Sequence, residues 1–147
     1  MSAKLASRPL FTLASANRML PLVRMIVSDI VELFRDVRDR EERLNGLRQG
    51  DARSKQRGDL YDEEVEQIRQ DLEKDVERLQ SFVDELLELG VEFKDPVIGL
   101  IDFPAMMDGQ EVYLCWKLGE PTITHWHTLE AGFTGRQLLK LAESAAN

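Results

Sequence analysis

Cysteine and histidine are scarce in this chain of 147 residues. The single cysteine, Cys115, excludes an internal disulfide and is typical of a reducing compartment. The two histidines, His125 and His127, stand two positions apart, so a histidine-based site would have to lie in that one segment.

Long hydrophobic runs are also absent. Charged residues interrupt every apolar stretch well short of the roughly 20 residues that span a bilayer. The N-terminal residues 1–17 contain no apolar segment typical of a signal peptide. We therefore expect a soluble cytoplasmic protein with no membrane partner.

An excess of positive charge is missing as well. The net charge is −8, so binding to nucleic acid would have to overcome repulsion from phosphate, and we do not expect it. Charged residues make up 31% and hydrophobic residues 43%, a globular composition, and the length fits a single domain over 1–147.

What the first half does contain is helical periodicity. Apolar residues advance by four and three in a heptad seam, which predicts a helix from about 13 to 47. Thr12 is suited to cap its N-terminus, and Pro21 predicts a kink or break. The seam positions are Ala16, Leu20, Val23, Val27, Ile30, Phe34, Val37, Glu41 and Leu44.

A second seam predicts a second helix that ends near Gly90. It alternates in the same way except for a four-plus-four step at Leu72 to Val76. A non-periodic loop near 46–59 joins the two helices into an antiparallel hairpin over 12–90. The seam positions are Tyr61, Val65, Ile68, Leu72, Val76, Leu79, Val83 and Leu86.

The two ends of this hairpin differ. Near residues 20 and 86 each helix carries a second apolar stripe, so this base should be covered by the rest of the chain or by a partner. Between about 35 and 78 only a narrow seam remains, flanked by charged residues. That part should project as a coiled-coil-like arm.

Residues 91–137 change to β-branched and aromatic composition. We predict strands near 99–103, 110–117 and 122–128, with turns at Asp108-Gly109 and Gly119-Pro121. Residues 138–147 read as a short helix or a tail. The predicted fold is α+β, with a small three-stranded antiparallel sheet packed on the base of the hairpin.

The segment "ITHWHTLEAGFTGRQ" is the first place to look for a site. On a strand, His125 and His127 point to one face, and Glu130 could add a third ligand for zinc or iron. The alternatives are a pair of half-buried, hydrogen-bonded histidines and a metal-free surface for a ligand or partner.

Four further residues are candidates. Arg136 follows two glycines and precedes Gln137. Its guanidinium could bind a carboxylate or phosphate, or it could pair internally with Asp102 or Glu120. Asp102 lies in an apolar run, so it should be paired or exposed, and it could orient a histidine. Cys115 is either a small core residue or, with a histidine on the adjacent strand as base, a nucleophile.

The loop from Arg48 to Asp59 is the most basic part of the chain. It holds four basic residues against two acids, which allows contact with RNA or another polyanion. It has no aromatic residues on which bases could stack, so we interpret it as a solvated loop.

Several segments together resemble a known family. "FTLASANRMLPLVR", "GLIDFPA", "DGQEVYLCWKLGE" and "HWH…AGFTGRQ" are similar to the uncharacterised prokaryotic family called domain of unknown function 2203. The resemblance covers nearly the whole chain and implies no activity. Such proteins usually have an acid directly after "WH" and Asp two positions later, where this chain has Thr128 and Glu130.

These patterns leave three hypotheses about function. The first is a non-enzymatic interaction or assembly protein that associates with itself or with a protein partner. The second is a small-molecule or metal site, with a hydrolytic form, at the His-x-His strand and the Gly-Arg-Gln turn. The third is polyanion binding through the basic tip. We expect them in that order.

Overall fold

The computed structural model describes residues 10–49 and 59–139. It confirms the α+β class with a helical hairpin, but the antiparallel sheet has five strands rather than three. The helices are α2 (Leu13–Gln49) and α4 (Asp59–Glu88), and the sheet follows chain order with β1 (Glu92–Asp95), β2 (Leu100–Met107), β3 (Gln110–Lys117), β4 (His125–Thr128) and β5 (Gln137–Leu138). A short 3₁₀ turn, η1 (Phe133–Gly135), precedes β5.

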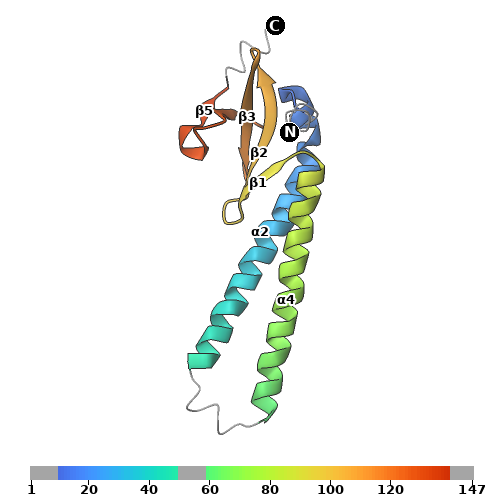
Figure 1. Cartoon of the computed structure of the whole chain (residues 1–147), viewed down its shortest axis with the longest axis vertical. Coiled ribbons are helices and arrows are strands. Elements are labelled where there is room, and N and C mark those ends of the chain that lie inside the picture. The colour runs from blue at the N-terminus through green and yellow to red at the C-terminus, as the bar shows by residue number, and fades with distance from the viewer. Residues whose placement is uncertain (1–9, 50–58, 140–147) are drawn as a thin grey trace, which may run out of the picture.

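Two predicted features lie largely outside the described residues. The basic tip was predicted over residues 48–59, of which 50–58 are not described, and the tail over residues 138–147, of which 140–147 are not described. The described ends of these two segments belong to α2, to α4, and to β5 with the residue that follows it. The structure therefore describes the remainder of the hairpin and the sheet (Figure 1).

Helix α2 begins where Thr12 predicts. The Thr12 Oγ1 accepts a hydrogen bond from the Ser15 N–H at 3.0 Å, and the Ser15 Oγ accepts one from the Thr12 N–H at 2.9 Å. This reciprocal cap satisfies two N–H groups at the helix start. We predicted a kink or a break at Pro21, and the break does not occur, because α2 continues through that residue. One lost hydrogen bond does not end a helix whose flanking residues, Leu20 and Val23, are buried in the core.

Among the described side chains of the second seam, one position departs from the prediction. Leu72 and Leu86 are buried, but Val76 is 49% exposed. At the four-plus-four step, Asp75 turns toward α2 in its place and pairs with Arg40. An ion pair therefore interrupts the apolar seam of the arm, where the sequence pattern predicted valine.

Gly90 ends the second helix as predicted. It adopts φ of 89°, and the following Val91 N–H donates to the Leu86 carbonyl at 2.9 Å. Glycine takes this left-handed conformation without steric cost, so the chain reverses directly from α4 into β1.

The strands differ from prediction in number and length. β1 and β5 contain four and two residues, too few to show alternation. β2 runs to Met107 instead of stopping before Pro104. Pro104 is tolerated because its carbonyl points to the edge, where it accepts from the Phe11 N–H at 2.7 Å, and its own nitrogen faces that same edge rather than β3.

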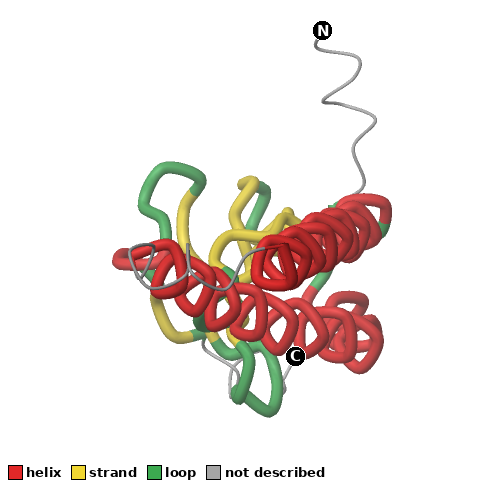
Figure 2. The backbone as a smooth tube through the Cα atoms, turned by 90° about the horizontal axis from the view of Figure 1, so that it is seen from below, coloured by secondary structure: helices red, strands yellow, loops and turns green. Residues whose placement is uncertain are grey.

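The inner face of the sheet covers the base of the hairpin, as predicted. Figure 1 shows the first turns of α2 on one side of the sheet and the η1–β5 segment on the other. In the view along the hairpin, the two helices lie side by side with the strands beyond them (Figure 2). The core that joins the layers includes Val23, Val27, Ile30, Phe103, Val112 and Trp116. A separate small cluster in the arm contains Val37, Leu44 and Leu72.

Candidate functional site

The sheet has a polar outer face, turned away from the helices. Cross-strand pairing places Asp102 opposite Cys115, Cys115 opposite His125, and Tyr113 opposite His127. Residues between them, such as Phe103, Leu114 and Trp116, point the other way into the core. The alternation of β-strands thus gathers the chemically active side chains on one face.

Asp102 and His127 form a buried pair at the centre of this face. The His127 Nε2 lies 3.0 Å from both Asp102 carboxylate oxygens, and the two residues are each 3% exposed. The His127 Nδ1 lies 2.7 Å from the Thr128 carbonyl oxygen. A carbonyl only accepts, so Nδ1 carries a hydrogen and Nε2 is the atom that faces the carboxylate.

Cys115 completes a cluster with this pair. The ligand atoms of Asp102, Cys115 and His127 all lie within 4.8 Å of one another, and among the described residues this is the group of at least three such donors that could surround one ion. We call these three residues the donor cluster. Burial, and then the nearby Asp102 charge, raise the pKa of Cys115 to about 12. The thiol therefore stays protonated, which argues against a nucleophilic role.

The burial of Asp102 also raises the pKa of its carboxyl group, against the opposing influence of His127. Further charge surrounds the cluster. The Tyr113 hydroxyl donates to Glu92 at 2.9 Å, and the Lys94 Nζ lies 2.9 Å from the same carboxylate. The Tyr113 ring contacts the His127 ring with centroids 5.3 Å apart. These contacts hold the imidazole in one orientation.

Arg136 pairs internally with Glu120, one of the two acids that the sequence offered. Its Nη2 lies 3.0 and 2.8 Å from the two carboxylate oxygens, and its guanidinium stacks 5.2 Å from the Phe133 ring. The Lys117 N–H also donates to Glu120 at 2.9 Å. The Arg136 Nε is buried and makes no hydrogen bond within the described part of the chain. Arg136 thus fixes the η1–β5 segment against the sheet.

The other candidates are dispersed. The His125 Nδ1 lies 2.9 Å from the Thr124 hydroxyl and 3.7 Å from the Glu120 carboxylate. Glu130 and Gln137 are exposed, on the turn after β4 and on β5. The two histidines do share the outer face, but the structure groups His127 with Asp102 and Cys115 rather than with His125 and Glu130.

The link between Asp102 and Cys115 had a signal in the sequence. Asp108 and Gly109 adopt φ of 53° and 76°, which defines a two-residue hairpin turn. Such a turn pairs Met107 with Gln110, and counting outward places Asp102 opposite Cys115. No sequence pattern indicated the contacts among Tyr113, Glu92 and Lys94, because β1, which carries two of them, is too short to predict.

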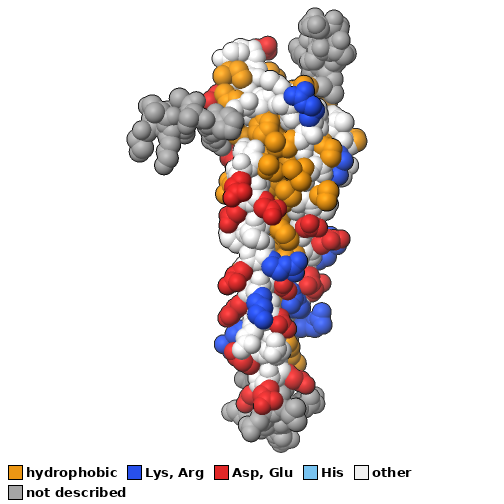
Figure 3. Space-filling model, turned by 90° about the vertical axis from the view of Figure 1, so that its right-hand side faces the viewer, with side chains coloured by type: hydrophobic (Ala, Val, Ile, Leu, Met, Phe, Trp, Pro, Cys, Tyr) orange, Lys and Arg blue, Asp and Glu red, His pale blue; other side chains and the backbone are white. Residues whose placement is uncertain are grey.

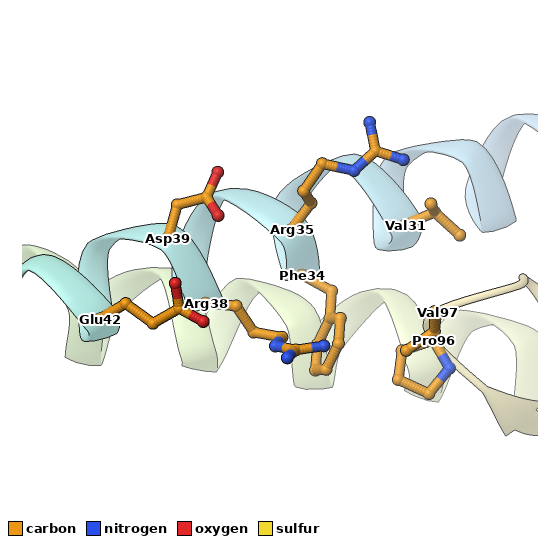
Figure 4. Close-up of a pocket in the computed structure, with 8 residues that line it drawn as sticks. All are labelled: Val31, Phe34, Arg35, Arg38, Asp39, Glu42, Pro96 and Val97. Carbon is orange, nitrogen blue, oxygen red and sulfur yellow. The ribbon is translucent and has the colours of Figure 1, made fainter.

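A pocket lies away from the outer face, between α2 and the turn after β1. Figure 4 shows Arg38 beside Phe34, with Pro96 and Val97 across from them. The Arg38 guanidinium lies 5.8 Å from the Phe34 ring centroid. The pocket has a volume of about 190 Å³. Ligand pockets typically occupy about 300–1,000 Å³, so this one fits water or a single side chain better than a metabolite.

The helices also expose apolar side chains near the sheet. Figure 3 shows them gathered over the upper part of the hairpin, with charged side chains over the arm. Leu22 is 49% exposed and Met25 is 66% exposed. Leu33, on the same stripe of α2, lines an open pocket together with Phe82 of α4. We call Leu22, Met25, Leu33 and Phe82 the apolar flank.

Neither described helix combines the length and apolar composition that crossing a bilayer requires. No curated protein and no solved structure matches the chain. Residues 9–139 match an established family pattern described as an uncharacterized conserved protein. The match spans both helices and all five strands, and the chain therefore belongs to the DUF2203 family.

Proposed function

We propose that this protein is an assembly protein that associates with a second copy of itself through the apolar flank. The observation that carries the proposal is the exposure of Leu22 and Met25 beside a hairpin base whose other side the sheet already covers. The arm is less suited to such a contact, because Val37, Leu44 and Leu72 of its narrow seam are buried between α2 and α4. Exposed apolar area of this kind favours association.

The spacing of charges on α2 favours a second copy as the partner. Arg18, Leu22, Met25 and Asp29 follow at steps of four, three and four, which places them on one stripe of the helix. Arg18 and Asp29 are exposed and lie equally far from the midpoint between the two apolar residues.

This order is self-complementary about a two-fold axis. If two copies of α2 cross antiparallel near Leu22 and Met25, each Arg18 faces the partner's Asp29. The apolar residues then meet at the axis, and two symmetric ion pairs flank them. Most homodimers use such an isologous contact, in which one patch meets itself.

The proposal is tested by the solution mass of the purified full-length chain, measured by sedimentation across 1–200 µM (roughly the range where weak homodimers appear). The expected result is a monomer–dimer equilibrium. Leu22→Asp should weaken association about tenfold or more, because a charge replaces buried apolar area. Val76→Asp is the matched control, since Val76 is also 49% exposed but lies on the arm.

A charge swap tests the orientation. Arg18→Asp and Asp29→Arg should each weaken the dimer several-fold, because each substitution sets like charges together at two symmetric positions. The double variant Arg18→Asp/Asp29→Arg should recover the original affinity. A strict monomer at every concentration, or an equal effect of Leu22→Asp and Val76→Asp, would overturn the proposal.

A further inference from the structure

We propose that the donor cluster of Asp102, Cys115 and His127 binds a divalent transition metal ion of the zinc class. The site lies on the outer face of the sheet and is independent of the apolar flank. Its three side chains offer one carboxylate, one imidazole and one thiol that loses its proton to bind an ion as a thiolate, and they are all buried. These are the ligand types that zinc takes in proteins.

The three ligands come from adjacent strands of one rigid sheet. Asp102 on β2 stands directly opposite Cys115 on β3. His127 on β4 pairs with Tyr113, so its ring crosses β3 diagonally to reach Asp102. A site built on strands holds its ligands with less freedom than a site on loops.

The orientation of His127 is that of a metal ligand. Its Nδ1 donates to the Thr128 carbonyl, which leaves Nε2 directed at the other two donors. Histidines that bind metals usually donate their second ring N–H to a carbonyl or carboxylate in this way. Thr128 supplies this contact from its backbone, so the absence of an acidic side chain at that position does not remove it.

The spacing fits an ion. Without a metal, the contact of 3.0 Å between Nε2 and each carboxylate oxygen is attractive when a hydrogen lies between them. On a tetrahedral zinc ion with bonds of about 2.0–2.3 Å, neighbouring ligand atoms lie roughly 3.3–3.6 Å apart. For His127 and Asp102, replacing that hydrogen by an ion therefore needs movements of only a few tenths of an ångström, and the Cys115 Sγ lies within 4.8 Å of both ligand atoms.

The ligand set also restricts the metal. A thiolate and an imidazole favour zinc, cobalt or iron over magnesium and calcium, which prefer oxygen. One carboxylate and one thiolate neutralise the two positive charges of the ion, which a buried site requires. His125 and Glu130 take no part in this set, because the structure directs them elsewhere.

Cobalt(II) provides the test. The untagged chain is refolded with Co²⁺, and absorption is recorded where thiolate–cobalt charge transfer appears. The expected result is a band that saturates at one equivalent and that Zn²⁺ abolishes. Cys115→Ser should remove the band, and His127→Gln should weaken Co²⁺ binding on the order of 100-fold. His125→Gln, the matched control on the same strand and face, should leave both unchanged.

Circular dichroism of each variant shows whether it folds, and the wild-type chain decides the question if His127→Gln does not. A wild-type chain that refolds with no thiolate band, and whose melting temperature ignores Zn²⁺ and chelator, overturns the proposal. The same conclusion follows if His125→Gln abolishes the band and His127→Gln keeps it. Zinc that raises the melting temperature of the wild type but not of Cys115→Ser supports the proposal.

Discussion

At the scale of single residues, one arginine links the two helices of the arm through its charge. Arg40 pairs with Asp75 across the two helices and with Asp36 on its own helix at 3.1 Å. The Arg40 and Asp75 side chains are only 21% and 19% exposed. A charged pair at this depth replaces one layer of the apolar seam and fixes the alignment of the helices.

The pair makes the stability of the arm dependent on pH. The hydrogen bond from Arg40 lowers the pKa of Asp75 in the folded chain. A carboxyl group with a lowered folded pKa stabilises the fold above its unfolded value of about 4, and this contribution is lost as the pH falls through the folded value.

Arg40→Leu should therefore lower the free energy of unfolding by about 1 kcal/mol at neutral pH. The difference from wild type should shrink at acid pH, as the pH falls through the lowered pKa of Asp75 and the carboxyl group becomes protonated. Urea unfolding at both pH values measures this, with Arg43→Leu, an exposed arginine of the same helix, as control. An equal loss at both pH values would show that packing rather than charge is responsible.

At the scale of elements, the hairpin between β1 and β2 is fixed by one glycine. Gly99 adopts φ of 67°, and a Cβ built there would lie 2.8 Å from the Val27 side chain and 2.9 Å from the Leu118 Cβ. The turn can approach α2 this closely only because the side chain is missing.

Gly99→Ala should destabilise the protein by about 2–3 kcal/mol, because it adds both backbone strain and overpacking. Gly109 separates the two causes. It has a similar φ of 76° but nothing within 4 Å of a built Cβ, so Gly109→Ala should cost only about 1 kcal/mol. Chemical denaturation of both variants gives the comparison. Equal losses would mean that contact with α2 is unimportant.

The helices and strands differ in how well the sequence predicted them. The helices followed from apolar periodicity, which is strong over long segments, and Gly90 and Thr12 marked an end and a beginning correctly. Periodicity could not foresee that Asp75 would displace Val76, because that exchange depends on Arg40 of the other helix. β1 and β5 were missed because four and two residues are too few to establish a pattern of period two.

The candidate site could be predicted only in part. The shared face of His125 and His127 follows from their spacing on a strand, and the structure has it. Their partners depend on register between strands, which spacing within one strand does not contain. The position of Asp102 opposite Cys115 could have been predicted from the register that the Asp108-Gly109 turn sets. The contact from Tyr113 to Glu92 could not, because it depends on β1, which was not predicted.

At the scale of the whole molecule, the described residues form two hydrophobic clusters of different size. The base joins α2 and α4 to the sheet in one large cluster that includes Val23, Ile30 and Trp116. Among the described residues of the arm, the buried apolar ones are Val37, Leu44 and Leu72. Because local stability follows the burial of apolar contacts, the arm should open more readily than the base.

Hydrogen exchange followed by mass spectrometry measures this difference. Amides of α2 near Leu44 and of α4 near Leu72 should exchange at least about tenfold faster than amides near Ile30 and in β3, since each 1.4 kcal/mol of opening free energy is a factor of ten. Exchange at high protein concentration should slow further around Leu22 and Met25, where the second copy is proposed to bind, and should stay unchanged in the arm. Uniform protection along both helices would instead mean that the hairpin and the sheet unfold as one cooperative unit, and that the Arg40–Asp75 pair stabilises the arm as effectively as apolar packing stabilises the base.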